Sequence, residues 1–161
     1  MIKRFIYYIV LIDGSYGKLF YNTHSHSDTI NRLVQEGKTV VADRYAYSGV
    51  TYTHAKGIDL DWCKSSDKGL PNPNLVLLLT APIEALATRG DFGEERYENE
   101  AFLAKVKIAY DKLIENNWTI IDADGTMEEV KKRLEDATLD YLTNNQGVEV
   151  KNNLFMNSGT D

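Results

Sequence analysis

The sequence predicts an α/β fold in three layers, with helices flanking a parallel sheet. Four short apolar runs have the length expected of strands that are covered on both faces. They occupy residues 5–12, 39–42, 75–79 and 118–121. Helical patterns of apolar residues separate the runs, and strands that alternate with helices are typical of right-handed βαβ units in a doubly wound sheet.

The first run, residues 5–12, is expected to be a buried strand rather than part of a secretory signal. Four β-branched and three aromatic residues in this run favour a strand. Asp13 and Gly14 follow it where a small-residue cleavage site would be expected. The first helix is predicted over residues 28–36, because Ile30 and Leu33 share one face and Gly37 can end it.

The later helices have recognisable starts. Pro82 suits the first turn of a helix that runs to about Arg89. Residues 100–115 carry an apolar stripe at helical spacing. Thr126 and Glu129 form a capping box that opens the last helix. From residue 145 the chain is polar, so we expect one domain over residues 1–144 and a loose tail over residues 145–161.

Composition limits the classes of function. The 161 residues are 43% hydrophobic, which is enough for one domain with a core. A net charge of −6 argues against a general binder of nucleic acid or of membrane surfaces. The single cysteine, Cys63, suits a reducing compartment, and no run approaches the roughly 20 apolar residues of a membrane span. We therefore expect a cytoplasmic protein, with the nucleus as a further location.

Residues 43–57 predict a ligand site. They follow the predicted strand over residues 39–42 and include Asp43, Arg44 and a hydroxyl residue, Ser48. Open α/β sheets bind ligands at the carboxyl ends of their strands, and an arginine fork can hold two phosphate oxygens. Tyr47 and Tyr52 offer flat faces on which a nucleobase can stack. The alternative interpretation is an ion pair next to ordinary aromatic packing.

A second cluster lies over residues 89–98. It holds Arg89, Arg96 and Tyr97, and its glycines permit unusual backbone angles. A charged loop of this kind suits a lid that closes over phosphates and excludes water. The alternative is a solvated connection between two helices.

Together these segments resemble a known family. Residues 43–57, 61–64, 69–77 and 92–98 closely resemble the eukaryotic type of thymidylate kinase, in matching order between about residues 39 and 142. The resemblance implies a P-loop-kinase-like fold. It also implies transfer of the ATP γ-phosphoryl group to dTMP, giving dTDP for dTTP biosynthesis, with Mg²⁺ as cofactor and pairing as a homodimer.

The resemblance assigns roles on the acceptor side. Arg44 is similar to the catalytic arginine that clamps the acceptor phosphate. Asp43 is similar to the neighbouring acid of the magnesium and phosphate network, and so it is both a catalytic and a metal-ligand candidate. Ser48 and Tyr52 resemble residues that line the thymidine pocket.

Other roles fall on the lid and on the donor side. Arg96 resembles a catalytic lid residue, and Tyr97 resembles the lid residue near the deoxyribose. Arg89 corresponds to an arginine near the adenine of ATP. Asp122 and Ala123 lie in the loop that is expected to hold that adenine.

Upstream of residue 39 the chain departs from the family pattern, so residues 1–38 are atypical. Residues 13–20 echo a phosphate loop, in which Lys18 is the ATP-binding candidate. Leu19 stands where a serine or threonine would hold the metal. About 25 residues separate Lys18 from Asp43, fewer than the roughly 30 of one βαβ unit. The resemblance thus implies a degenerate or truncated phosphate-loop region and a missing edge strand, which would leave strand 39–42 exposed.

Two explanations of this departure stay open. One is a shortened or misassembled gene product, and the other is a natural variant that keeps the fold without the activity. The functional hypotheses divide in the same way. The chain is either a dTMP kinase that binds small nucleotides, or a catalytically impaired relative that serves as a nucleotide-binding or dimerisation module.

Overall fold

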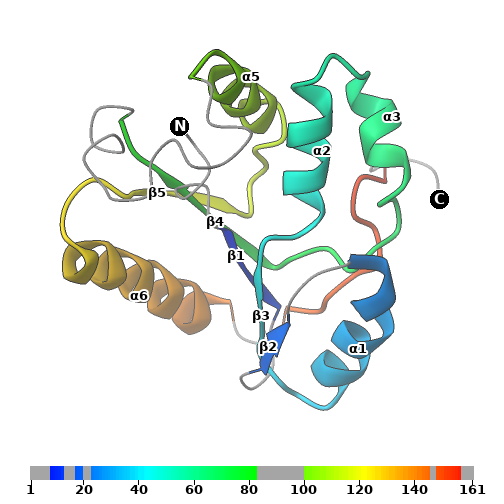
Figure 1. The fold of residues 1–161 in the computed structure, drawn as a ribbon. Coiled ribbons are helices and arrows are strands. Elements are labelled where there is room, and N and C mark those ends of the chain that lie inside the picture. The colour runs from blue at the N-terminus through cyan, green and yellow to red at the C-terminus, as the bar shows by residue number, and fades with distance from the viewer. Residues whose placement is uncertain (1–7, 13–16, 20–22, 83–99, 146–147, 157–161) are drawn as a thin grey trace.

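The computed structural model describes residues 8–12, 17–19, 23–82, 100–145 and 148–156 (Figure 1). The strands are β1 (Tyr8–Ile12), β2 (Gly17–Leu19), β3 (Val40–Asp43), β4 (Leu75–Thr80) and β5 (Trp118–Asp122). The helices are α1 (Thr23–Gln35), α2 (Ala46–His54), α3 (Leu60–Ser65), α5 (Glu100–Asp111) and α6 (Met127–Asn144).

The strands form one sheet with helices on both faces. Alternate side chains of β3 and β4, among them Val40, Ala42, Val76 and Leu78, pack with residues of α1, α2, α3 and α5. The intervening residues Leu75, Leu77 and Leu79 pack against α6. Because both faces are covered, the apolar runs are continuous rather than alternating. The expected three-layer α/β arrangement is confirmed (Figure 1).

The sheet order is β2-β3-β1-β4-β5. β2 pairs in parallel with β3, and β4 pairs in parallel with β5. β1 runs antiparallel to β3 and to β4, which departs from the parallel sheet expected from sequence. Because β3 and β4 both oppose β1, they run in the same direction, and the carboxyl ends of β3, β4 and β5 lie at one edge of the sheet.

The length of the connection explains the direction of β1. Only residues 13–16 separate β1 from β2. A parallel β1 would need a crossover of a dozen or more residues before the chain could start β2 and β3 at the opposite edge. The antiparallel direction places Ile12 beside Val40, at the edge where β2 and β3 begin, so a short connection suffices.

β2 corrects a further expectation. The sequence predicts that the strand at residues 39–42 is exposed at the edge of the sheet. Instead Lys18 of β2 pairs with Val41 of β3, so β3 is flanked on both sides and β2 is an edge strand of the sheet.

The ends of two helices follow the sequence signals. Gly37 has a φ of 75°, and its N–H donates to the Val34 carbonyl while Lys38 donates to Leu33, which is the Schellman pattern at the end of α1. Thr126 and Glu129 form both hydrogen bonds of the predicted capping box at the start of α6. The helix expected from Pro82 to about Arg89 lies outside the described residues beyond Pro82.

The capping box predicts a pH dependence. Hydrogen bonds from Thr126 lower the pKa of Glu129 below its ordinary value of 4.5. A lowered pKa in the folded state means that the stabilisation is fully present above pH 4.5 and is lost as the pH falls through the folded value. We expect Glu129→Gln to remove this part of the acid dependence of the melting temperature. Identical pH profiles for the two proteins below pH 4.5 would contradict the assignment.

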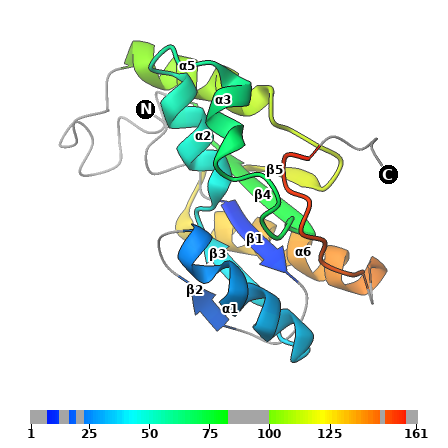
Figure 2. The ribbon, with the colours of Figure 1, turned by 90° about the vertical axis from the view of Figure 1, so that its right-hand side faces the viewer.

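The carboxyl-terminal segment corrects the expectation of a loose tail. Over residues 148–156 the chain runs back along the loop between α3 and β4, as Figures 1 and 2 show in red beside green. Leu154 is 2% exposed and belongs to the main core. The polar average of the segment predicts disorder, but three of its apolar residues, Val150, Leu154 and Phe155, pack in or against the core.

Candidate functional site

The centre of the candidate site is the junction between β3 and α2. Asp43 is the last residue of β3 and is half-buried. Arg44 follows with a φ of 67°, in the left-handed region that residues other than glycine rarely adopt. A conformation of this kind costs of order 1–3 kcal/mol, and such residues cluster at functional sites. The exposed Arg44 side chain is therefore held at the carboxyl edge of the sheet against a local backbone preference.

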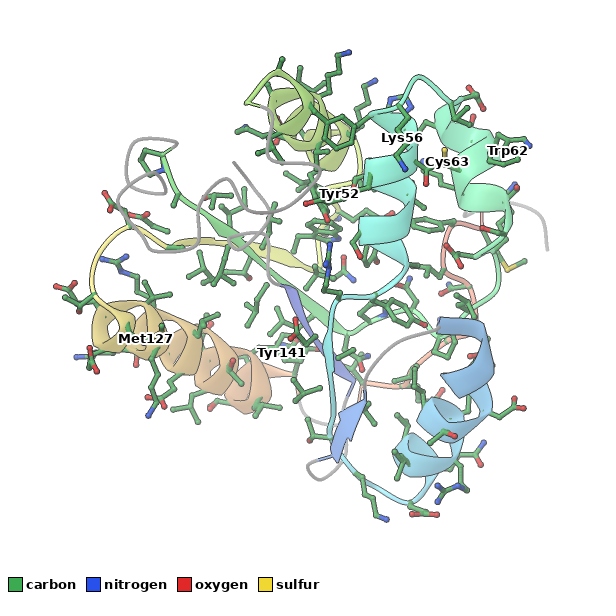
Figure 3. All side chains as sticks on the ribbon, in the orientation of Figure 1. Tyr52, Lys56, Trp62, Cys63, Met127 and Tyr141 are labelled. Atoms are coloured by element: carbon green, nitrogen blue, oxygen red, sulfur yellow. The ribbon has the colours of Figure 1, made fainter. Side chains whose placement is uncertain are left out.

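Arg44 and Tyr52 form a pair. The Arg44 guanidinium carbon lies 5.6 Å from the centroid of the Tyr52 ring, within cation–π range. Figure 3 shows Tyr52 on the side of α2 away from α3. Burial raises the pKa of the Tyr52 phenol, and the charge and hydrogen bond of Arg44 lower it by less. The site thus offers a permanent cation beside a neutral aromatic alcohol.

Two further side chains shape the start of α2. The Ser48 hydroxyl donates to the Tyr45 carbonyl over 3.0 Å, which leaves its oxygen lone pairs able to accept from a ligand. The Tyr45 hydroxyl donates to the Pro71 carbonyl over 2.8 Å. Burial raises the pKa of the Tyr45 phenol, so this donor stays protonated.

Tyr47 is not available to a ligand. It is fully buried, with its ring centroid 4.8 Å from that of Trp118 and 5.4 Å from that of Phe155. The expectation that Tyr47 offers a face to a nucleobase is therefore wrong, and the packing interpretation holds for this residue. Tyr52, which is only partly buried, keeps a face in the site.

The loop after β5 is the second part of the site. Ala123 is buried and donates from its N–H to the Thr80 carbonyl over 2.7 Å. The Asp122 carboxylate accepts from the Asp124 N–H over 2.9 Å. Gly125 has a φ of 120°, and an added Cβ would come within 2.7 Å of a Glu129 carboxylate oxygen. The loop is thus a tight, well-defined turn.

Arg133 holds this loop in place, although the sequence patterns did not indicate a role for it. Its guanidinium donates to the carbonyls of Asp122, over 2.8 Å, and of Asp124. Helical side chains point toward the helix amino terminus, so an arginine in the second turn of α6 can reach back to the preceding loop. An arginine seven residues after the capping Thr126 was the available signal.

The two parts of the site share one edge of the sheet. Asp43 ends β3 and Asp122 ends β5, and these strands run in the same direction. With β1 and β4 between them, three strand spacings of about 4.8 Å put their axes about 14 Å apart. The two parts of the site are therefore neighbours along one edge of the sheet.

Lys18 was expected in a phosphate loop at this edge of the sheet, but the structure does not place it there. It lies in β2, a strand, rather than in a loop that leads into a helix. β1, after which a phosphate loop was expected, ends beside Val40, at the edge opposite to Asp43. The expected phosphate-loop placement of Lys18 is therefore corrected. Arg89, Arg96 and Tyr97 lie outside the described residues.

The residues present fit a magnesium ion held partly by its substrates. Asp43 is a half-buried acidic residue next to Arg44 in the sequence. Among the described residues no group of three or more histidine, cysteine or acidic side chains could hold a metal by itself. Mg²⁺ typically takes one or two carboxylates together with substrate phosphates and water, so one carboxylate at this edge suits it.

Comparison with known proteins gives the family. A family model described as thymidylate kinase matches residues 13–134. The chain belongs to the thymidylate kinase family. Among its relatives, the thymidylate kinase of Dictyostelium discoideum is 44% identical over 108 residues, which cover 66% of this chain and 49% of the relative. The human thymidylate kinase is 45% identical over 105 residues, or 63% of this chain and 50% of the relative.

A solved structure supports the fold of the thymidylate kinase family. The thymidylate kinase of Candida albicans superposes with a TM-score of 0.67 and 29% identity, over 80% of this chain and 67% of that chain. The expected fold class is confirmed by this match. The chain spans about half the length of the curated family members named above. In the described part of the chain no helix is both long and apolar enough to cross a membrane.

Arg133 gives a prediction about the loop of this family member. We expect Arg133→Ala to free the Asp122 and Asp124 carbonyls and to speed hydrogen exchange of the loop amides about 100-fold, because two hydrogen bonds to a charged group contribute about 3 kcal/mol together. Lys131→Ala, which removes an exposed pair with Glu135 on the same helix, is the matched control. Equal exchange in both variants would show that Arg133 does not hold the loop.

Proposed function

We propose that this chain is a dTMP kinase, which transfers the γ-phosphoryl group of ATP to dTMP and releases dTDP. The observation that most supports this function is the conformation of Arg44. Its strained backbone holds a cation beside Tyr52 at the carboxyl edge of the sheet. Membership in the thymidylate kinase family supports the same reaction. Phosphoryl transfer requires mainly positioning and neutralisation of charge, which is the kind of chemistry that an arginine in this place supplies.

Each residue has a role in this proposal. Arg44 binds the acceptor phosphate through two parallel N–H donors. Tyr52 packs against the thymine or sugar, and Ser48 accepts a hydrogen bond from the substrate. The loop at Asp122 and Ala123 holds the adenine of ATP. When bound, Mg²⁺ neutralises charge on the phosphates, with Asp43 as its protein ligand.

Arg89, Arg96 and Tyr97 complete the proposal from the family resemblance. Arg89 would lie near the adenine of ATP, and Arg96 would stabilise the phosphates during transfer. Tyr97 would lie close to the deoxyribose of dTMP. Single alanine variants at these positions separate the roles, since loss of Arg89 should raise the KM for ATP and loss of Tyr97 should raise the KM for dTMP.

A coupled assay of ADP release tests the proposal. With dTMP, ATP and Mg²⁺ we expect turnover within the roughly 1–100 s⁻¹ that is ordinary for kinases. Omitting dTMP or replacing Asp43 with asparagine should abolish the signal. Absence of dTMP-dependent ADP release from the folded wild-type chain would contradict the proposal.

The second candidate is a nucleotide-binding or dimerisation module without turnover. Lys18 lies in β2, and β1 ends at the edge of the sheet opposite to Asp43. Such a chain would keep the residues that bind dTMP, but Lys18 would not be positioned to bind the phosphates of ATP. Calorimetry that detects dTMP binding in a chain without ADP release would favour this candidate, whereas turnover that is lost on Lys18→Ala would exclude it.

A homodimer and a location in the cytoplasm, with the nucleus as a further location, belong to the same proposal. The exposed Trp62 and Ile58 support pairing, since Trp62 is 65% exposed on α3 and points away from the chain in Figure 3. The lone thiol of Cys63 supports a reducing compartment. Light scattering of wild type and of Trp62→Glu tests the pairing, and a monomeric wild type would contradict it. A fluorescent fusion tests the location.

A further inference from the structure

The carboxyl-terminal segment, residues 148–156, is fastened along the loop between α3 and β4. Three backbone hydrogen bonds join them: Gly69 to Leu154 over 3.0 Å, Leu154 to Leu70 over 3.1 Å, and Asn72 to Lys151 over 2.8 Å, each donor named first. Figures 1 and 2 show the two segments side by side. The segment is therefore part of the fold.

Two consecutive apolar residues anchor the segment. Leu154 is 2% exposed in the main core. Phe155 has a φ of 55°, the same disfavoured left-handed region that Arg44 occupies. The centroid of its ring lies 5.4 Å from that of Tyr47, edge to face, and the Lys64 ammonium lies 5.9 Å from the same centroid. A strained backbone conformation persists only where the surrounding contacts hold it. The contacts of the Phe155 ring therefore fix the position of this residue.

These contacts converge on the first turn of α2. Tyr47, in that turn, is packed between the rings of Trp118 and Phe155. Tyr45, at the amino-terminal cap, donates to Pro71, in the loop along which the carboxyl-terminal segment runs. The Tyr45 side chain makes no capping hydrogen bond to the helix, so packing rather than a cap directs the start of α2.

We propose that residues 148–156 act as a clasp that positions the acceptor side of the site, with Phe155 as a positioning residue. Arg44 precedes Tyr45 directly, and Ser48 follows Tyr47 directly. Holding Tyr45 and Tyr47 from the core side fixes the backbone that bears Arg44 in its strained conformation. The clasp acts through Tyr47 and does not touch the substrate. Its effect on dTMP rests on the proposed function.

The clasp should act on one side of the site only. The tyrosines of α2 and the clasp belong to the cluster on one face of the sheet. Ala123, in the loop proposed to hold adenine, belongs to the cluster with α6 on the other face. Loosening Phe155 should therefore weaken dTMP binding and leave ATP binding unchanged.

Phe155→Ala, measured by calorimetry and by hydrogen exchange, tests the clasp. We expect dTMP affinity to fall about tenfold, which corresponds to about 1.4 kcal/mol, with ATP affinity unchanged. Amides of residues 45–50 should exchange faster, while those of α6 should not. Phe155→Tyr, which keeps the ring, should restore both readouts, and Met156→Ala, at a residue 58% exposed, should change neither.

The outcomes separate the clasp from the proposed function. If dTMP affinity and exchange over residues 45–50 match the wild type, the clasp inference is overturned. If both nucleotide affinities fall together and exchange rises in α6 as well, the effect is general loss of stability, and the clasp is again overturned. If the wild type binds no dTMP, the proposed function fails, and faster exchange confined to residues 45–50 still establishes the positioning.

Discussion

Replacing Arg44 with alanine is expected to weaken dTMP binding about 100- to 1,000-fold, because two hydrogen bonds to a charged group contribute about 3–4 kcal/mol together. Arg44 is exposed at the end of β3 and is not a core residue, so the folded chain should remain available for the measurement. Calorimetric titration with dTMP gives the affinity. Arg32→Ala, which removes an exposed arginine of α1 that pairs with Glu36, is the matched control.

The backbone of Arg44 sharpens this prediction. Alanine normally stabilises a protein relative to glycine by about 0.4–1 kcal/mol. At a position whose backbone is left-handed, glycine is instead the more stabilising of the two. At a φ of 67° we expect Arg44→Gly to be more stable than Arg44→Ala by about 1 kcal/mol, although both lose dTMP binding. If either variant keeps wild-type affinity, or if the alanine variant is the more stable one, the account of Arg44 as a strained functional residue fails.

Leu154→Ala is expected to lower the free energy of unfolding by about 2–5 kcal/mol, the usual range for truncating a buried leucine. Leu154 is 2% exposed, and its backbone N–H and carbonyl both bond to the loop after α3. Urea unfolding followed by circular dichroism measures the change. Met156→Ala, two residues later at 58% exposure, should stay within about 0.5 kcal/mol of wild type.

The Leu154 prediction separates a packed segment from a loose one. A loose tail would contribute nothing, so a loss below about 0.5 kcal/mol for Leu154→Ala would contradict the structure of residues 148–156. A two-state transition with an unchanged denaturant slope would show that the difference is one of stability.

Sequence reasoning succeeded where a local pattern determines the element. The apolar runs of β3, β4 and β5, the glycine that ends α1 and the capping box of α6 are each set by a few neighbouring residues. The junction of Asp43 and Arg44 was placed for the same reason, since it follows a continuous apolar strand. The left-handed conformation of Arg44 was not predictable, because nothing local distinguishes it from an ordinary strand end.

Sequence reasoning failed where residues that are distant in the sequence determine the direction of a strand or the burial of a side chain. The direction of β1 depends on the short connection to β2 and on which neighbours it finds in the sheet. The burial of Tyr47 depends on Trp118 and Phe155, which are far away in the sequence. Residues 145–161 are polar on average, and the average concealed Leu154 and Phe155. Hydrophobic periodicity carries no information on such long-range pairings.

The most direct test of the central claim compares dTMP with thymidine in calorimetric titrations of the wild-type chain. If Arg44 forms an acceptor-phosphate site, dTMP binds at one saturable site per chain, and thymidine, which lacks the phosphate, binds at least 100-fold more weakly, in line with the loss expected for Arg44→Ala. Equal affinity for the two ligands, or no binding of dTMP by the folded chain, would contradict the account.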